Sequence, residues 1–192
     1  MAFRMGARGL STMLASVALL ASGAGAEPRL KVCVDYGCDK TSAARLDAAA
    51  SNRIAGLFSR IDSAEAERTA VARAIGELER IVGRQTGTGT DAPRNTGLED
   101  RNGQLDCIAE SHNTLTYLQF LDDHGHLDYH SISGRVVRRR NLFGTHWTAV
   151  LEEYGSGQRY AVDSWYGANG DPAEIQPLAA WLQGARPVDD AD

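Results

Sequence analysis

The sequence predicts an α+β protein in which helical stretches come first and strands follow. Three observations support this prediction. Apolar residues recur with the helical period of 3.6 in the stretches 43–61 and 62–83. A third helical stretch covers 106–125, where a terminal glycine is typical of a helix end. Residues 127–137 and 144–167 have the composition of strands, and the second stretch surrounds a glycine-rich turn typical of a hairpin.

The first 26 residues have the pattern of a secretory signal peptide. Arg4 and Arg8 precede the apolar run 10–20, and small residues follow at Ala24 and Ala26. No other stretch approaches the roughly 18 to 20 apolar residues that cross a bilayer. We therefore expect an exported, periplasmic or secreted protein without a membrane span, in which residues 27–192 form a single domain.

Charge argues against nucleic acid as a partner. The chain holds 20 Lys and Arg against 25 Asp and Glu, and removing the two arginines of the signal peptide leaves 18 against 25. The mature net charge of −7 (18 − 25) repels a polyanion. The basic run 135–140, RVVRRR, is the exception, and we interpret it as a solvated strand end or loop.

The three cysteines predict one disulfide and one thiol, because an exported protein meets oxidising conditions. Cys33 and Cys38 lie in KVCVDYGCDK, where the Tyr-Gly pair indicates a turn that brings the two sulfur atoms together. Their spacing does not match the usual zinc patterns. Three histidines near the end of the third helical stretch also lack a second ligand cluster: His124, His126 and His130. We therefore expect no metal and no other cofactor.

The first two helical stretches and the segment that follows them show no catalytic motif. Asp62 and Glu65 have the spacing of a capping box at the start of the second helix. We expect both helices to serve in packing. Residues 84–104 contain glycines, a proline and no apolar period, so we predict a loop that is either an active-site flap or disordered.

Cys107 occupies a position that favours a nucleophile. Asp106 is a competent helix N-cap, which places the cysteine in the first turn, where unpaired backbone N–H groups favour a thiolate. Such a thiol still needs a base. Gln104 is a candidate donor to an oxyanion beside the cysteine, or simply a loop residue.

The hairpin supplies a candidate base and acid. His146 and Thr148 lie on one face of the first strand by period two. A two-residue turn at Gly155-Ser156 would set Asp163 opposite Thr148, on the face of the histidine. A three-residue loop would turn the aspartate away, and a four-residue loop would pair it too far along. The first register predicts a His–Asp pair and, with Cys107, an acyl-transfer triad.

Three segments resemble the transglutaminase-like cysteine enzyme superfamily: LDC at a helix start, THWTAVLEE on one strand and RYAVDSWYG on the next. The likeness covers residues 104–167 and is greatest to the bacterial transglutaminase-like cysteine proteinases, which are periplasmic. It implies a papain-like α+β fold in which the cysteine helix packs on an antiparallel sheet. It also implies that Cys107 is the nucleophile, His146 the base and Asp163 the orienting acid.

We expect residues 27–192 to form a single transglutaminase-like domain, with an N-terminal strand and helical part (27–83), a loop (84–104) and a catalytic core (105–183). After its cysteine the chain reads Ile-Ala-Glu-Ser, where that branch commonly has an acidic pair followed by Tyr-Ala. No calcium ligand set can be matched, so calcium dependence is not carried over.

The resulting expectation is a thiol hydrolase that cleaves peptide or amide bonds through an acyl-thioester. Its substrate would be a protein or peptide, with an exported surface protein as one candidate. Three alternatives stay open from the sequence: a peptidoglycan endopeptidase, a protein-crosslinking transglutaminase and a non-catalytic module that keeps the fold.

Overall fold

The computed structural model describes residues 27–96, 102–140 and 144–187, so the predicted signal peptide lies outside them. It contains a two-stranded sheet, β1-β2, and a four-stranded antiparallel sheet in the order β3-β4-β5-β6. Among the described residues, no helix is long and apolar enough to cross a membrane. The elements are β1 (Arg29–Cys33), the short 3-10 helix η1 (Tyr36–Cys38), β2 (Thr41–Arg45), α1 (Ala48–Leu57), α2 (Ala64–Thr86), α3 (Cys107–Asp123), β3 (His130–Arg140), β4 (Gly144–Glu153), β5 (Arg159–Asp163), β6 (Glu174–Pro177) and α4 (Leu178–Leu182).

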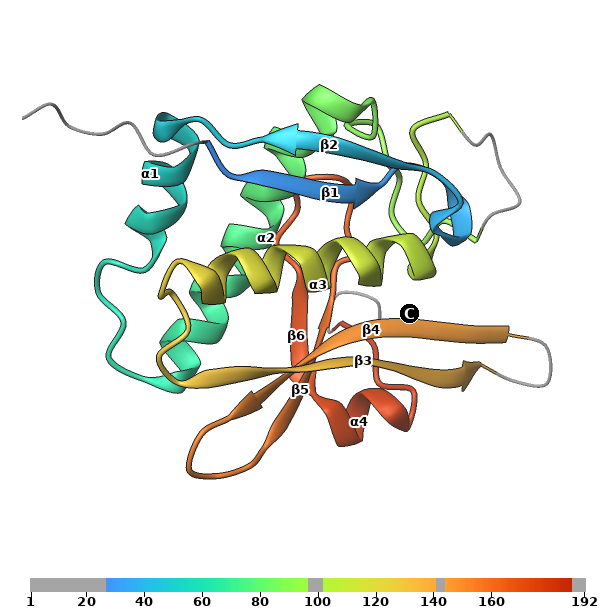
Figure 1. The fold of residues 1–192 in the computed structure, drawn as a ribbon. Coiled ribbons are helices and arrows are strands. Elements are labelled where there is room, and N and C mark those ends of the chain that lie inside the picture. The colour runs from blue at the N-terminus through green and yellow to red at the C-terminus, as the bar shows by residue number, and fades with distance from the viewer. Residues whose placement is uncertain (1–26, 97–101, 141–143, 188–192) are drawn as a thin grey trace, which may run out of the picture.

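Helices lie on both faces of the larger sheet, and this confirms the α+β class. The helices α2 and α3 pack on one face, while α4 lies on the other (Figure 1). Side chains of β4 alternate between the two layers, because Ala149 and Leu151 belong to the core with α2 and α3, whereas Val150 packs with Trp181 of α4. The two layers therefore pack on opposite faces of the same sheet.

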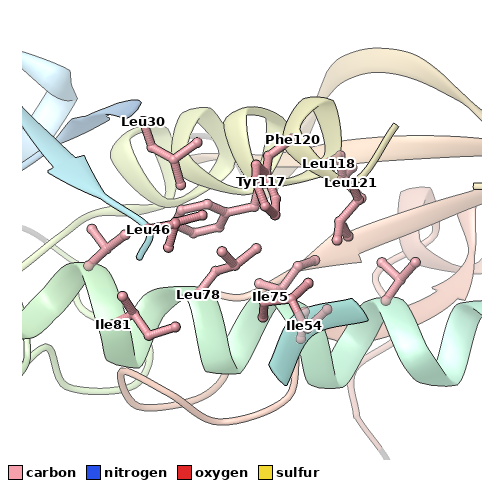
Figure 2. Packing of buried hydrophobic residues seen from close by; sticks show 14 of the residues in the cluster. Leu30, Leu46, Ile54, Ile75, Leu78, Ile81, Tyr117, Leu118, Phe120 and Leu121 are labelled. Atoms are coloured by element: carbon pink, nitrogen blue, oxygen red, sulfur yellow. The ribbon is translucent and has the colours of Figure 1, made fainter. Parts of the chain in front are cut away.

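The main core lies between α2 and α3 (Figure 2). Ile75 and Leu78 of α2 are fully buried, as is Leu118 of α3, and Tyr117 is 1% exposed. Burying each of the aliphatic side chains stabilises the fold by roughly 2 kcal/mol. This packing fixes α3, and with it the position of its first residue, against the sheet.

The first two helices differ from the predicted ranges at their ends. Residues 43–45, predicted as helix, belong to β2, because they pair with β1. The N-cap of α2 is Ser63, whose hydroxyl accepts from Ala66 N at 3.2 Å, rather than Asp62. The helix runs past Gly83 to a left-handed Gly87. Gly83 lies inside the helix, and a glycine is needed there because a Cβ would lie 2.8 Å from the backbone of Gly89.

The start of α3 is as predicted. The Asp106 side chain accepts from Ala109 N at 2.9 Å, which makes it the N-cap, and Cys107 is the first helical residue. The carboxylate of Asp106 also accepts from Gly37 N at 3.0 Å, so the loop of η1 holds the helix start from outside. The helix ends at Asp123, shortly before a left-handed Gly125.

The hairpin of β4 and β5 has the predicted register. Ala149 pairs with Val162, and the same count sets Asp163 opposite Thr148. The connection is the four residues 154–157, not a two-residue turn. It is closed by Glu153 N donating to Gln158 O at 2.8 Å. This loop extends the predicted turn by one residue on each side, so the register is unchanged, and Gly155 and Gly157 adopt positive φ within it.

Candidate active site

The sulfur of Cys107 lies beside the start of β4. Its Sγ is 3.9 Å from the carbonyl oxygen of Thr145, the residue that precedes His146. The side chain is partly exposed and forms no disulfide. The other two cysteines, Cys33 and Cys38, are joined to each other, which confirms the predicted pairing. A thiol therefore reaches the strand that carries the candidate base.

His146 and Asp163 form a buried pair. Nε2 of the ring and Oδ2 of the carboxylate are 2.6 Å apart, and the two residues are 1% and 2% exposed. Because an ionised carboxylate only accepts, Nε2 carries the proton and Nδ1 is the basic nitrogen. Nδ1 is buried and has no hydrogen-bond partner in the part of the chain that the structure describes. The ring thus keeps one nitrogen for accepting a proton.

His146 lies on the part of β4 that has no neighbouring β5 residue. The last β4–β5 pair is Ala149 with Val162, so β4 continues towards Gly144 beyond the end of β5. In Figure 1 this part of β4, paired with β3 alone, extends beneath the start of α3. The chain after Asp163 is free to turn here and bring aromatic side chains onto the ring.

Three aromatic rings enclose His146. Its centroid lies 4.6 Å from that of Trp165, 5.7 Å from Tyr166 and 5.5 Å from Trp181. The Nε1 of Trp181 donates to Oδ2 of Asp163 at 2.8 Å, so one carboxylate oxygen accepts from both the indole and the imidazole. The rings exclude water from the His–Asp hydrogen bond, and the second donor fixes the carboxylate.

The sequence reasoning missed Trp181 and Tyr166 as neighbours of His146. Trp165 also contacts the ring, whereas Trp147 lies under the guanidinium of Arg135. The aromatic residues in SWYG and LAAWL were the available signal. Nothing in the local sequence indicates that α4 folds back onto the histidine.

The interpretation of the basic run 135–140 as solvated is wrong for Arg138. It is 6% exposed, and its guanidinium lies 4.3 Å from the ring centroid of Trp181. It donates to Tyr166 Oη at 2.6 Å and to the carbonyl oxygens of Trp181 and Ala185. These acceptors and the indole face replace water around the charge. Arg138 therefore fastens α4, and through it Trp181, to the sheet.

Gln104, the predicted oxyanion candidate, is engaged in holding its own loop. Its Oε1 accepts from Ala92 N at 3.0 Å and from Asn95 Nδ2 at 2.8 Å, and its Nε2 donates to Thr90 O at 2.7 Å. Asn95 in turn accepts from Trp165 Nε1 at 2.7 Å through its backbone oxygen. The amide thus ties the loop to the wall of the histidine site. A direct role in catalysis remains a prediction.

Three buried carboxyl groups lie behind the site. Ser164 follows Asp163 and donates to Glu110 Oε2 at 2.5 Å. Burial, together with repulsion from Glu110, raises the pKa of Asp91 to about 9. Burial likewise raises the pKa of Glu110, and raises that of Glu79 well above its usual range. Asp91 is therefore a protonated acid at neutral pH.

The three histidines near the end of α3 do not converge. His124 Nδ1 contacts Phe120 O at 2.7 Å, and His126 stacks on Phe58 at 4.8 Å between centroids. His130 is bonded to Glu67 instead. Within the described ranges, no group of three His, Cys, Asp or Glu side chains is arranged to hold a metal ion.

Comparison with protein-family models, with curated proteins and with solved structures finds no match to this chain. The site is therefore defined by its own geometry. It belongs to an α+β protein in which α3 begins with a cysteine, next to β4, whose buried histidine pairs with an aspartate of β5.

Proposed function

We propose that the protein is an exported thiol hydrolase that cleaves a peptide or amide bond through an acyl-thioester on Cys107. The observation that carries the proposal is the 2.6 Å bond between His146 and Asp163. It leaves Nδ1 of a buried ring without a partner among the described residues. That ring is one residue along β4 from the carbonyl that contacts the sulfur. Thiol, base and orienting carboxylate are the groups that cysteine acyl transfer requires.

The reaction follows from these roles. Nδ1 of His146 takes the proton of Cys107, and the thiolate attacks the carbonyl carbon of the substrate. Backbone N–H groups at the start of α3 stabilise the oxyanion. The C–N bond then breaks, and the imidazolium returns the proton to the departing amine. A water molecule, deprotonated by the same ring, hydrolyses the thioester and restores the thiol.

The order of the parts supports the finer assignment to the transglutaminase-like superfamily and, within it, to the bacterial cysteine proteinases. The nucleophile opens a helix packed on an antiparallel sheet, and the base and acid follow on adjacent strands. The Cys33–Cys38 disulfide accords with export. We propose a protein or peptide as substrate, such as an exported surface protein.

Labelling of Cys107 with iodoacetamide across pH tests whether the thiol is activated. In the wild type we expect labelling to persist well below pH 8.5, about where an unperturbed thiol titrates. His146→Ala should lower the labelling rate at neutral pH at least about tenfold. His124→Ala, which removes an exposed histidine, is the matched control, and Cys107→Ser gives the blank. A wild-type curve centred near 8.5 and unchanged in His146→Ala would indicate a non-catalytic module.

A second measurement tests the covalent intermediate and the substrate class. With p-nitrophenyl acetate, intact mass should show one acetyl group on Cys107 as p-nitrophenolate leaves, followed by release of acetate. Peptide release from a panel of exported proteins would support the proposed hydrolase. Cleavage of isolated peptidoglycan instead would identify a cell-wall endopeptidase, and incorporation of a primary amine would identify a transglutaminase. Either of these results would replace the proposal.

A further inference from the structure

Arg135 of β3 lies against the first turn of α3. Its Nε donates to Ser111 Oγ at 3.1 Å, and one terminal nitrogen reaches the carbonyl oxygen of Ile108 at 3.4 Å. The other terminal nitrogen contacts Nε2 of His112. Ser111 Oγ also donates to the carbonyl oxygen of Cys107 at 2.7 Å. The guanidinium is thus held by the same turn that carries the candidate nucleophile.

Within the described ranges, no carboxylate forms an ion pair with this guanidinium. The guanidinium lies 4.7 Å from the ring centroid of Trp147. The aromatic ring stabilises a cation but does not cancel its charge. Burial lowers the pKa of Arg135, while Cys107 and Asp106 act in the opposite direction. Arginine nevertheless stays protonated in proteins, so a fixed positive charge lies against the helix turn that begins with Cys107.

We propose that Arg135 is the electrostatic partner of the Cys107 thiolate, a positioning residue that favours the ionised sulfur before substrate arrives. The inference rests on the proposed function in taking Cys107 as the nucleophile. A cation near a partly buried acid typically shifts its titration by 1 to 3 pH units. The positive end of α3 acts in the same direction.

The other charged groups around the sulfur differ in their effect on the thiolate. From α3, the N-cap carboxylate of Asp106 opposes a second negative charge, although its bonds to Gly37 N and Ala109 N hold its oxygens. His112 contacts Arg135, and the burial of His112 together with that positive charge lowers its pKa, so it is neutral near pH 7. From β4, His146 moves protons during the reaction. Arg135 supplies the charge that does not change with pH.

The test is the pH dependence of iodoacetamide labelling in Arg135 variants of the full chain. Arg135→Gln should move the half-maximal pH of Cys107 labelling upwards by about one unit and slow labelling near pH 6.5 about tenfold. Arg135→Lys keeps the charge and should restore most of that shift. Arg139→Gln, which removes an exposed arginine of the same strand, is the matched control.

A purely structural role predicts a different pattern. The Gln and Lys variants would then lower the melting temperature alike, and the labelling curve of folded protein would stay in place, which would overturn the inference. If Arg135→Gln does not fold, Arg135→Met takes its place, because it keeps an apolar stem and removes the charge, and an unshifted labelling curve of the folded protein would overturn the inference. Combining Arg135→Gln with His146→Ala separates the two proposals. A shift from arginine without an effect of histidine retains this inference and refutes the proposed triad.

Discussion

The described residues form two buried histidine–carboxylate pairs, and only one of them resembles a catalytic site. His130 Nδ1 lies 2.8 Å from Glu67 Oε1, and His146 Nε2 lies 2.6 Å from Asp163 Oδ2. All four residues are at most 2% exposed. Distance and burial therefore do not distinguish the two pairs.

The second ring nitrogen distinguishes them. His130 Nε2 lies 3.2 Å from a terminal nitrogen of Arg68, and Glu67 also accepts from the backbone N–H groups of residues 128 and 129. Every polar atom of that pair is used in joining α2 to β3. His146 Nδ1, by contrast, has no partner in the described ranges, and His146 follows Thr145, whose carbonyl oxygen contacts a thiol. The proposed role of His146 requires this nitrogen, and His130 has no equivalent.

The comparison predicts its largest effect at Glu67. Replacing it with alanine leaves His130 and two backbone N–H groups without their acceptor. We expect the free energy of unfolding to fall by about 3 to 5 kcal/mol. Urea unfolding measures this, with Glu65→Ala, an exposed glutamate of the same helix, as control. Labelling of Cys107 in the folded fraction should not change. A loss below about 1 kcal/mol would contradict the structural role assigned to this pair.

Asp163→Asn should give the opposite result, a large loss of reactivity with little loss of stability. Asparagine keeps the shape but favours the wrong tautomer of His146. We expect acylation of Cys107 by the activated ester to slow on the order of a hundredfold. Stopped-flow release of p-nitrophenolate measures the rate, and urea unfolding should show a change within about 2 kcal/mol. Equal acylation rates in the wild type and in Asp163→Asn would show that Asp163 takes no part in the mechanism.

Measured over one pH unit, the smallest effect concerns carboxyl groups that have no histidine partner. Because the folded-state pKa of Asp91 is raised to about 9, its stabilising contribution is complete below about pH 4 and is lost as pH rises towards 9. The free energy of unfolding should fall by up to about 1.4 kcal/mol per pH unit for one such group. Asp91→Asn mimics the protonated acid and should flatten this dependence in urea titrations between these limits. Asp123→Asn, at an exposed position, should leave it as in the wild type.

Features set by neighbouring residues were predictable from the sequence. The Asp106 cap, the start of α3 at Cys107 and the β4–β5 register depend on spacing within one or two elements. The Cys33–Cys38 disulfide follows from a short turn. These local patterns were enough to bring a histidine and an aspartate onto one face.

Features set by tertiary packing were not predictable. Residues 43–45 fit a helical period, yet pairing with β1 makes them a strand. Arg138 reads as solvated in a basic run, but α4 covers it and supplies its acceptors. Trp181 meets Asp163 only because that helix folds back onto the sheet. In each case a partner distant in sequence overrides the local pattern.

The disulfide next to α3 has a practical consequence for handling the protein. Gly37, between the two bridged cysteines, donates to the carboxylate of Asp106, which caps α3. Asn113 of the same helix bonds both the N–H and the carbonyl of Cys33. A reductant added to protect Cys107 during purification would also open the bridge and loosen this brace. Assays run with and without reductant would therefore sample two chemically different proteins, and the oxidation state of both sulfur sites has to be established before any rate is compared.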